Sequence, residues 1–284
     1  MEVIAFFHKG SSTYSYLVVD PSTLRAAVVD PVLDYDAAAA RSGTTSAQAI
    51  VDAVRARGYG LDWILETHAH ADHLSAAQFV KRELGGKVAI GSGIKAVQAA
   101  FKKLYNLDER FPTDGSQFDK LWEDGETFSI GSLKMRVLAM PGHTSDSVAY
   151  LVEDAAFVGD TLFMPDSGSA RCDFPGGDAG ALYDSVRRLL DLPEETRLFM
   201  CHDYAPGGRE HRNQTTVGEE RQANIHVKEG ISREDFVKLR QGRDATLPVP
   251  ALLLPAIQVN IRAGRFPEPE ADGAVYLKIP VDRF

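Results

Sequence analysis

Short apolar runs and helix-like patterns alternate along most of this chain. Near the N-terminus, three runs rich in β-branched and aromatic residues are separated by turn formers, which predicts strands at residues 2–8, 14–19 and 25–29. From residue 46 the apolar side chains recur at the spacing of one helix face, as Ile50, Val51 and Val54 show, and Gly58 ends the pattern. The chain therefore begins with a group of strands followed by a helix over 46–57.

The same alternation continues to about residue 201. Further strands are expected at 63–67, 87–90, 134–140, 147–152, 156–158 and 197–201. Further helices are expected at 74–84, 94–104 and 179–190, and in the later part of the chain at 217–225 and 233–241. Two successive halves that each begin with strands are typical of a layered α/β sandwich, in which two sheets pack together and helices cover the outside.

Two segments break this pattern. Residues 106–126 are polar and rich in turn formers, and we expect them to form an excursion close to the active site. The end of the chain, from residue 248, is rich in proline, which predicts an extended chain that wraps the surface.

Composition narrows the class of protein. A chain of 284 residues with 44% hydrophobic content can form one large domain, or a domain with a small appendage. The formal net charge of −9 argues against binding to nucleic acid or to an anionic membrane. Only two cysteines are present, so no disulfide framework is expected, and no signal-peptide or membrane-spanning pattern is visible. These features predict a cytoplasmic protein.

Histidine and aspartate crowd the segment that follows the predicted strand 63–67. They are His68, His70, Asp72 and His73. Imidazole and carboxylate groups bind borderline divalent metals, and burying several of them at a strand end destabilises a protein unless a metal or another partner satisfies them. The segment therefore predicts a metal-binding protein, and we expect it to be a metalloenzyme.

Three further candidate ligands each follow an apolar strand. They are His143, Asp160 and His202. Gly142 and Gly159 directly precede the first two, and glycine lets the backbone turn sharply and present the next side chain to a shared pocket. We therefore expect these side chains to join the first cluster.

This set of seven side chains resembles the motifs of the metallo-β-lactamase superfamily. The resemblance covers roughly residues 1–204 and implies an αββα sandwich, two mixed sheets flanked by helices, with the metal site at their common edge. It implies a catalytic domain over 1–204 and a C-terminal extension over 205–284 that packs on the same domain.

The resemblance permits two metal arrangements. In the pattern of the hydroxyacylglutathione hydrolases (glyoxalase II), two zinc ions are bound and a bridging hydroxide attacks a thioester. One ion would be held by His68, His70 and His143, the other by Asp72, His73 and His202, with Asp160 as the bridge. In the pattern of the persulfide dioxygenases, one Fe(II) is held by His68, His143 and Asp160. The other four side chains, His70, Asp72, His73 and His202, would then support catalysis by orienting the ligands through hydrogen bonds.

Local markers favour the persulfide dioxygenase pattern. The stretch 168–174 is similar to the Gly-x-x-Arg-Thr-Asp-Phe motif of those enzymes, with Cys172 in place of threonine, and 202–204 matches their His-Asp-Tyr. The expected reaction is oxidation of glutathione persulfide by O₂ and water to sulfite and glutathione.

Two side chains near these markers are candidate substrate contacts. Arg171 could bind a substrate carboxylate through its planar fork, or could form a structural ion pair with Asp173 or Asp166. The hydroxyl of Tyr204 could reach the substrate or act in catalysis, or the ring could simply pack. A homodimer or higher homo-oligomer stays open, since the proline-rich tail could cover a second subunit.

Overall fold

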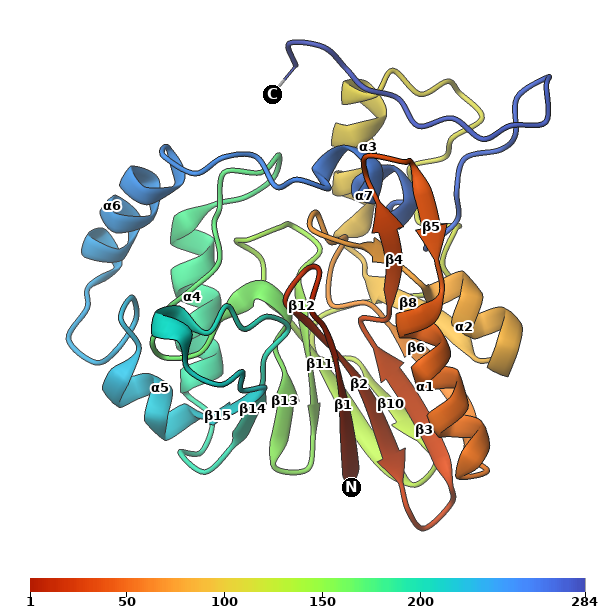
Figure 1. The fold of residues 1–284 in the computed structure, drawn as a ribbon. Coiled ribbons are helices and arrows are strands. Elements are labelled where there is room, and N and C mark those ends of the chain that lie inside the picture. The colour runs from red at the N-terminus through yellow and green to blue at the C-terminus, as the bar shows by residue number, and fades with distance from the viewer. Residues whose placement is uncertain (284) are drawn as a thin grey trace.

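Two six-stranded sheets packed face to face form the centre of the computed structural model, which describes residues 1–283 (Figure 1). The first sheet has the order β1-β2-β3-β6-β8-β9, formed by Glu2–His8, Thr13–Asp20, Arg25–Val29, Gly60–Leu65, Lys87–Gly91 and Lys120–Trp122. The second has the order β10-β11-β12-β13-β14-β15, formed by Thr127–Ile130, Leu133–Ala139, Val148–Val152, Ala155–Phe157, Arg197–Phe199 and Gln214–Thr216. Both sheets contain parallel and antiparallel neighbours.

Helices cover the outer face of each sheet (Figure 1). Beside the first sheet lie α1 (Thr45–Ala56), α2 (Ala77–Leu84), α3 (Ile94–Leu104) and α7 (Leu253–Asn260). Beside the second lie α4 (Ala179–Leu190), α5 (Val217–Ala223) and α6 (Arg233–Asp244). A small third sheet is formed by β4 (Val32–Asp36), β5 (Arg41–Gly43) and β7 (Leu74–Ser75). The layered αββα sandwich predicted from the sequence is confirmed.

The central strands are apolar because both of their faces are buried. All eight residues of β2 are buried. Tyr16 and Val18 belong to the cluster between the two sheets, whereas Leu17 and Val19 pack with the helices outside. Side chains alternate between the faces of a strand, so a strand covered on both sides carries no polar stripe. Each such aliphatic side chain contributes roughly 1.5–3 kcal/mol through burial.

Three segments differ from the sequence-based expectations. Residues 74–84 form β7 and then α2 rather than one helix. The segment 106–126 packs into the core, where Phe111 and Phe118 are buried in the same cluster as α1 and α3.

The proline-rich end is not extended throughout, because α7 forms within it. Pro255 lies in the first turn of α7, where its missing N–H costs no intrahelical hydrogen bond, and Leu253, Ile257 and Val259 are buried. Tertiary burial therefore favours a helix here, although the local sequence does not.

The chain after residue 204 adds to the same layers. Strand β15 pairs with β14, α6 packs on α4, and α7 lies against β7. The division into a catalytic domain over 1–204 and an extension over 205–284 stays a prediction. None of the helices within residues 1–283 is long and apolar enough to cross a bilayer.

Candidate metal centre

The predicted ligands all follow strands that end at one edge of the sandwich. His68 follows β6, His143 follows β11, Asp160 lies in the short helix η1 (Gly159–Thr161) after β13, and His202 follows β14. Strands β13 and β14 are parallel, and β11 runs in the same direction because β12 is antiparallel to both β11 and β13. Loops that leave parallel strands at their carboxyl ends meet in one place. The topology therefore brings together side chains that are more than 130 residues apart in the sequence. The contacts of Asp160 with His68 and with His202 show this.

Polar side chains from distant segments hold the histidine loop in place. Asp30, which follows β3 with a φ of +48°, accepts hydrogen bonds from the backbone N–H (2.7 Å) and the hydroxyl (2.8 Å) of Thr67. Asp146 accepts one from the backbone N–H of Ala69 at 2.8 Å. Asn260, the last residue of α7, donates to the carbonyl oxygens of His70 (2.7 Å) and His73 (2.9 Å). The loop thus depends on three separate elements for its conformation.

His68, His143 and Asp160 form one group of convergent donor atoms. All three side chains are buried, and their donor atoms lie within 4.8 Å of one another. The Oδ2 of Asp160 is 3.9 Å from the Nε2 of His68 and 3.7 Å from the Nε2 of His143. The Nδ1 of His143 donates to the carbonyl oxygen of Arg171 at 2.7 Å, which directs the opposite ring nitrogen into the site. This is the set that the sequence assigned to a single iron.

The site fits a metal ion by its buried, unsatisfied donors. Within residues 1–283, six donor atoms of the site are buried without a hydrogen-bond partner: the Nε2 atoms of His68, His70, His73 and His202, the Nδ1 of His70 and the Oδ1 of Asp160. Buried polar atoms are normally satisfied, so these six indicate a missing partner. Burial lowers the pKa of His68 well below its usual value, so its imidazole is neutral and presents a lone pair to a cation.

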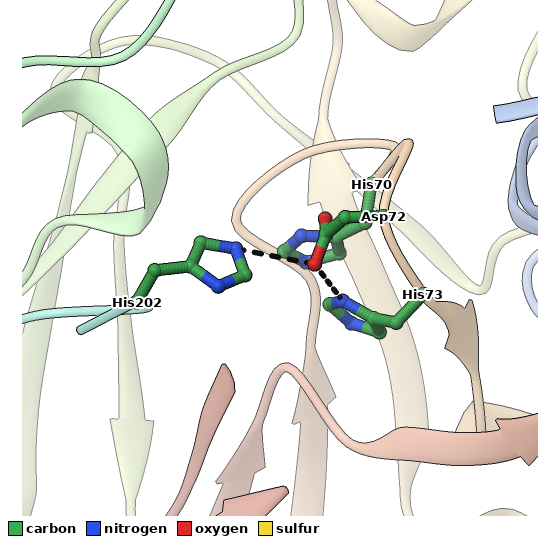
Figure 2. Close-up of side chains that lie close together, drawn as sticks. All are labelled: His70, Asp72, His73 and His202. Carbon is green, nitrogen blue, oxygen red and sulfur yellow. Dashed lines mark hydrogen bonds and ion pairs between the residues drawn. The ribbon is translucent and has the colours of Figure 1, made fainter. Parts of the chain in front are cut away.

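A second group of donors lies beside the first. Figure 2 shows His70, Asp72, His73 and His202 converging, with Asp72 between the two outer histidines. The Oδ2 of Asp72 is 3.2 Å from the Nδ1 of His73 and 3.4 Å from the Nε2 of His202. The Nε2 of His202 is also 3.3 Å from the Oδ1 of Asp160, so Asp160 borders both groups.

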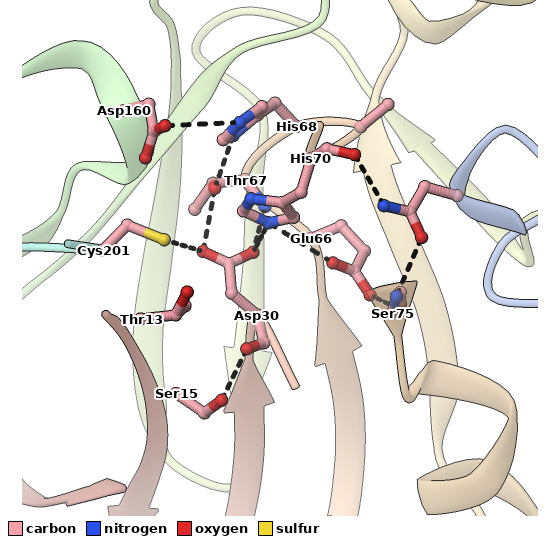
Figure 3. Close-up of polar contacts among 12 residues, drawn as sticks. Thr13, Ser15, Asp30, Glu66, Thr67, His68, His70, Ser75, Asp160 and Cys201 are labelled. Atoms are coloured by element: carbon pink, nitrogen blue, oxygen red, sulfur yellow. Dashed lines mark hydrogen bonds and ion pairs between the residues drawn. The ribbon is translucent and has the colours of Figure 1, made fainter. Parts of the chain in front are cut away.

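The orientation of His70 separates the two groups. Its Nε2 lies 3.0 Å from the Oδ1 of Asp30 and 3.7 Å from the Oε2 of Glu66 (Figure 3). Both carboxyl groups are buried, and burial raises the pKa of Asp30 and of Glu66. Glu66 is held in turn by the hydroxyl of Ser75. The Nε2 of His70 therefore faces two buried carboxyl groups without a hydrogen bond to either, and His70 is grouped with Asp72, and with Asp30 and Cys201, but not with His68.

The other predicted site residues line a cavity above the donors. The cavity has a volume of about 320 Å³, and Asp72, His143 and Asp160 form part of its wall. The ring of Tyr204 stacks on His202, with centroids 5.8 Å apart, and meets the edge of Phe163. The ring of Tyr204 therefore packs against its neighbours, as one of the two alternatives had it. A contact of its hydroxyl with a substrate, or a role in catalysis, stays a prediction.

Arg171 lines the same cavity but is already paired. Its guanidinium donates to both carboxylate oxygens of Asp173 at 2.6 Å and to the carbonyl of Pro248 at 2.7 Å. The ion pair with Asp173, which the sequence left open as an alternative, is present. A role of Arg171 in substrate binding stays a prediction.

Sequence reasoning assigned no role to the supporting residues Asp30, Glu66, Asp146 and Asn260. Asp30 directly follows the predicted strand 25–29, and Glu66 and Asp146 lie within three residues of His68 and His143, so their positions carried a signal. Only for Asn260 does the proximity to the site depend on tertiary structure alone.

Comparisons with known proteins agree with this geometry. The family model described as the metallo-beta-lactamase superfamily matches residues 8–202. A probable metallo-hydrolase from Burkholderia pseudomallei is 50% identical over 99% of both chains. A beta-lactamase hydrolase-like protein from Agrobacterium fabrum is 53% identical over 98% of this chain, which spans 64% of that protein's length. A protein named glyoxylase B2 from Dictyostelium discoideum is 48% identical over 96% of this chain and 94% of its own.

More distant similarity connects the chain to persulfide dioxygenases. The mitochondrial persulfide dioxygenase ETHE1 of Bos taurus is 30% identical over 91% of this chain and 87% of its own. The crystal structure of ETHE1 from Myxococcus xanthus superposes with a TM-score of 0.75 and 31% identity, covering 93% of this chain and all (100%) of that one. The sandwich, the buried donors at its edge and these relatives together identify a metal-binding enzyme, and the chain belongs to the metallo-β-lactamase superfamily.

Proposed function

We propose that this protein is an iron-dependent persulfide dioxygenase. In the balanced reaction, glutathione persulfide, O₂ and water give glutathione, sulfite and two protons. The observation that carries the proposal is the separate grouping of His68, His143 and Asp160. Two imidazoles and one carboxylate on one side of an ion are the ligand set of non-haem iron oxygenases, and they leave coordination positions open for substrates.

His68, His143 and Asp160 would hold the iron, which supplies the redox chemistry that lets O₂ react with sulfur. The remaining residues bind and position. Phe163 and Tyr204 form an aromatic wall of the cavity that limits the access of water. His202 lies between Asp72 and Asp160, 3.4 Å and 3.3 Å from their carboxylate oxygens, where it would offer a polar contact to a persulfide.

The similarity to ETHE1 in sequence and in structure supports this activity. The match of 168–174 to the family motif lies at the cavity wall, since Ser169, Ala170 and Arg171 line it. The carbonyl of Arg171 also positions His143, so this motif has a physical connection to the proposed iron site.

A dinuclear thioester hydrolase is the second candidate. It is favoured by the hydrolase and glyoxylase names of the more similar relatives. It is also favoured by the position of Asp160, whose Oδ1 lies 3.3 Å from His202 and whose Oδ2 faces His68 and His143. Two zinc ions in the two groups would make Asp160 a bridge and would activate water.

An oxygen-electrode experiment separates the two candidates. Protein purified without oxygen from iron-supplemented cells is mixed with glutathione persulfide, and in parallel with S-lactoylglutathione. The proposal predicts persulfide-dependent O₂ uptake with sulfite formed in equal amount, and no thioester cleavage. Thioester cleavage without O₂ uptake would assign the hydrolase activity instead. The variant His143→Ala serves as the inactive control in both assays.

A further inference from the structure

The cavity above the metal donors reaches helix α6. The cavity is lined by the metal donors Asp72, His143 and Asp160 and also by Arg240, Arg243 and Leu247. Its volume of about 320 Å³ is at the lower end of the range for small-molecule sites, about 300–1,000 Å³. A second cavity of about 420 Å³ adjoins it and shares Arg171, Phe174 and Pro250. A substrate whose sulfur lies at the metal donors would therefore extend towards α6.

Two of the three arginines along this path are already neutralised. Arg171 is held by both oxygens of Asp173. Arg240 is 1% exposed, donates to the carbonyl of Ser169 at 2.8 Å and pairs with the carboxylate of Asp244. A paired arginine adds little net charge, and recruiting it for a ligand would break a buried or bidentate pair.

Arg243 is the third, and its guanidinium makes no ion pair or hydrogen bond within residues 1–283. It is exposed, lies in the last turn of α6 and lines the same cavity as the metal donors. The chain as a whole carries a net charge of −9. An unpaired positive charge in the wall of this cavity is therefore opposite in sign to the charge of the protein as a whole. A guanidinium presents a planar fork that matches a carboxylate.

We infer that Arg243 binds the carboxylate of the thiol that carries the persulfide, and so selects peptidic thiols such as glutathione over thiols without a distal carboxylate. The identity of the reacting sulfur rests on the proposed function, whereas the carboxylate contact does not. In glutathione the glycyl carboxylate fits this role best, because an ammonium group next to the other carboxylate offsets its charge. Arg171 then keeps the cavity wall in shape through Asp173 and Pro248.

Calorimetric binding of glutathione and of its glycine monoethyl ester to the purified protein tests this inference. Wild-type protein should bind glutathione more tightly than the ester, which lacks the glycyl charge. In Arg243→Met the affinity for glutathione should fall about tenfold, to that of the ester, as expected for a partly exposed charged contact. Arg243→Lys should recover part of the difference. Lys238→Met, which removes an exposed cation of the same helix that does not line the cavity, should leave both affinities unchanged.

Several outcomes would overturn the assignment. Equal binding of glutathione by wild-type protein and Arg243→Met is one. An equal loss of affinity for glutathione and for the ester is another, because it would indicate a general change of the cavity. Loss of the discrimination in Arg283→Met instead would place the carboxylate in the adjoining cavity, which Arg283 lines.

The same proteins distinguish this inference from the proposed function. If wild-type protein discriminates between the two ligands but consumes no O₂ with glutathione persulfide, the dioxygenase proposal fails and the role of Arg243 stands. If it consumes O₂ and Arg243→Met has an unchanged KM for glutathione persulfide, the role of Arg243 fails and the dioxygenase proposal stands. The predicted result is a higher KM with an unchanged kcat.

Discussion

The Nε2 of His70 lies 3.0 Å from the Oδ1 of Asp30, a buried carboxyl group at the end of β3. The contact directs one ring nitrogen of His70, a residue of the metal-binding motif, towards Asp30. Because Asp30 also accepts two hydrogen bonds from Thr67, it connects the orientation of His70 to the backbone directly before His68. The relationship explains how seven candidate ligands separate into two groups.

The first prediction concerns Asp30. Asp30→Asn keeps the shape of the side chain but leaves only one acceptor for the two donors of Thr67, so we expect a loss of about 1–3 kcal/mol in the free energy of unfolding. Bound metal per chain should also fall. Chemical unfolding and metal analysis measure the two effects.

Asp34→Asn is the matched control for this change. Asp34 also accepts two hydrogen bonds, from the backbone N–H (2.9 Å) and the hydroxyl (2.6 Å) of Ser46, but it lies in β4 and holds the start of α1 rather than the histidine loop. The control should lower stability and leave metal content unchanged. Wild-type metal content and stability in Asp30→Asn would contradict the role of Asp30.

Much of the site could be predicted because it depends on local patterns. Apolar runs predicted the strands, and the polar residues directly after them predicted which side chains would meet at the edge of the sandwich. The resemblance offered two groupings of these side chains, and the sequence could not decide between them, because the choice depends on ring orientation. The ring of His70 is oriented by Asp30 and Glu66 from below, and its backbone by Asn260, which is 190 residues away in the chain.

The fold shows the same division between local and tertiary information. Helices α3 and α4 were predicted at their observed bounds, since their apolar spacing is regular. Helix α7 was missed because its buried residues, Leu253, Ile257 and Val259, occur among prolines and are buried only through tertiary packing in the cluster outside the first sheet.

The second prediction concerns the pair between Arg240 and Asp244 on α6. Asp244 also accepts a hydrogen bond from the backbone N–H of Cys172 at 2.8 Å, next to the carbonyl that positions His143. Asp244→Asn leaves the buried guanidinium of Arg240 without its counter-charge, so we expect a loss of about 3–5 kcal/mol. Chemical unfolding measures this loss.

The exposed pair between Arg233 and Asp184 provides the control for this prediction. Asp184 is 62% exposed, so Asp184→Asn should change stability by no more than about 0.5 kcal/mol. Equal losses of stability in the two variants would show that the buried pair of Arg240 and Asp244 does not stabilise the packing of α6 on residues 169–172.

The third prediction is a pH dependence due to Glu220 in α5. Burial raises the pKa of this carboxyl group to about 8, from a model-peptide value of 4.5. Between pH 4.5 and 8 the folded state therefore holds a proton that the unfolded state has lost, so Glu220 makes stability fall as pH rises through this window. The slope is at most about 1.4 kcal/mol per pH unit.

Glu220→Gln removes this titration. The glutamine side chain has nearly the same shape, and its carbonyl oxygen can still accept the hydrogen bond from the side-chain amide of Asn224. The variant should gain stability relative to wild-type protein between pH 5 and 8, about the limits set by the two pKa values. Glu195→Gln, at an exposed position without an ion pair in the described part of the chain, should follow the wild-type curve. A constant difference between wild-type protein and Glu220→Gln across this range would disprove the assignment.

The fourth prediction separates the two donor groups. His68→Ala and Asp160→Ala should abolish tight metal binding, because each removes one of three ligands. His70→Asn should retain most of the bound metal, since His70 contacts Asp30 and does not belong to the ligand group. A dinuclear site would instead lose metal in all three variants, which metal analysis of the purified proteins would reveal.

The stoichiometry of metal in the wild-type protein tests the central claim most directly. Protein prepared without oxygen from cells supplied with both iron and zinc is measured by elemental analysis against protein concentration. One iron per chain, held by His68, His143 and Asp160, is the predicted result. Two metal ions per chain, with zinc predominant, would contradict the account.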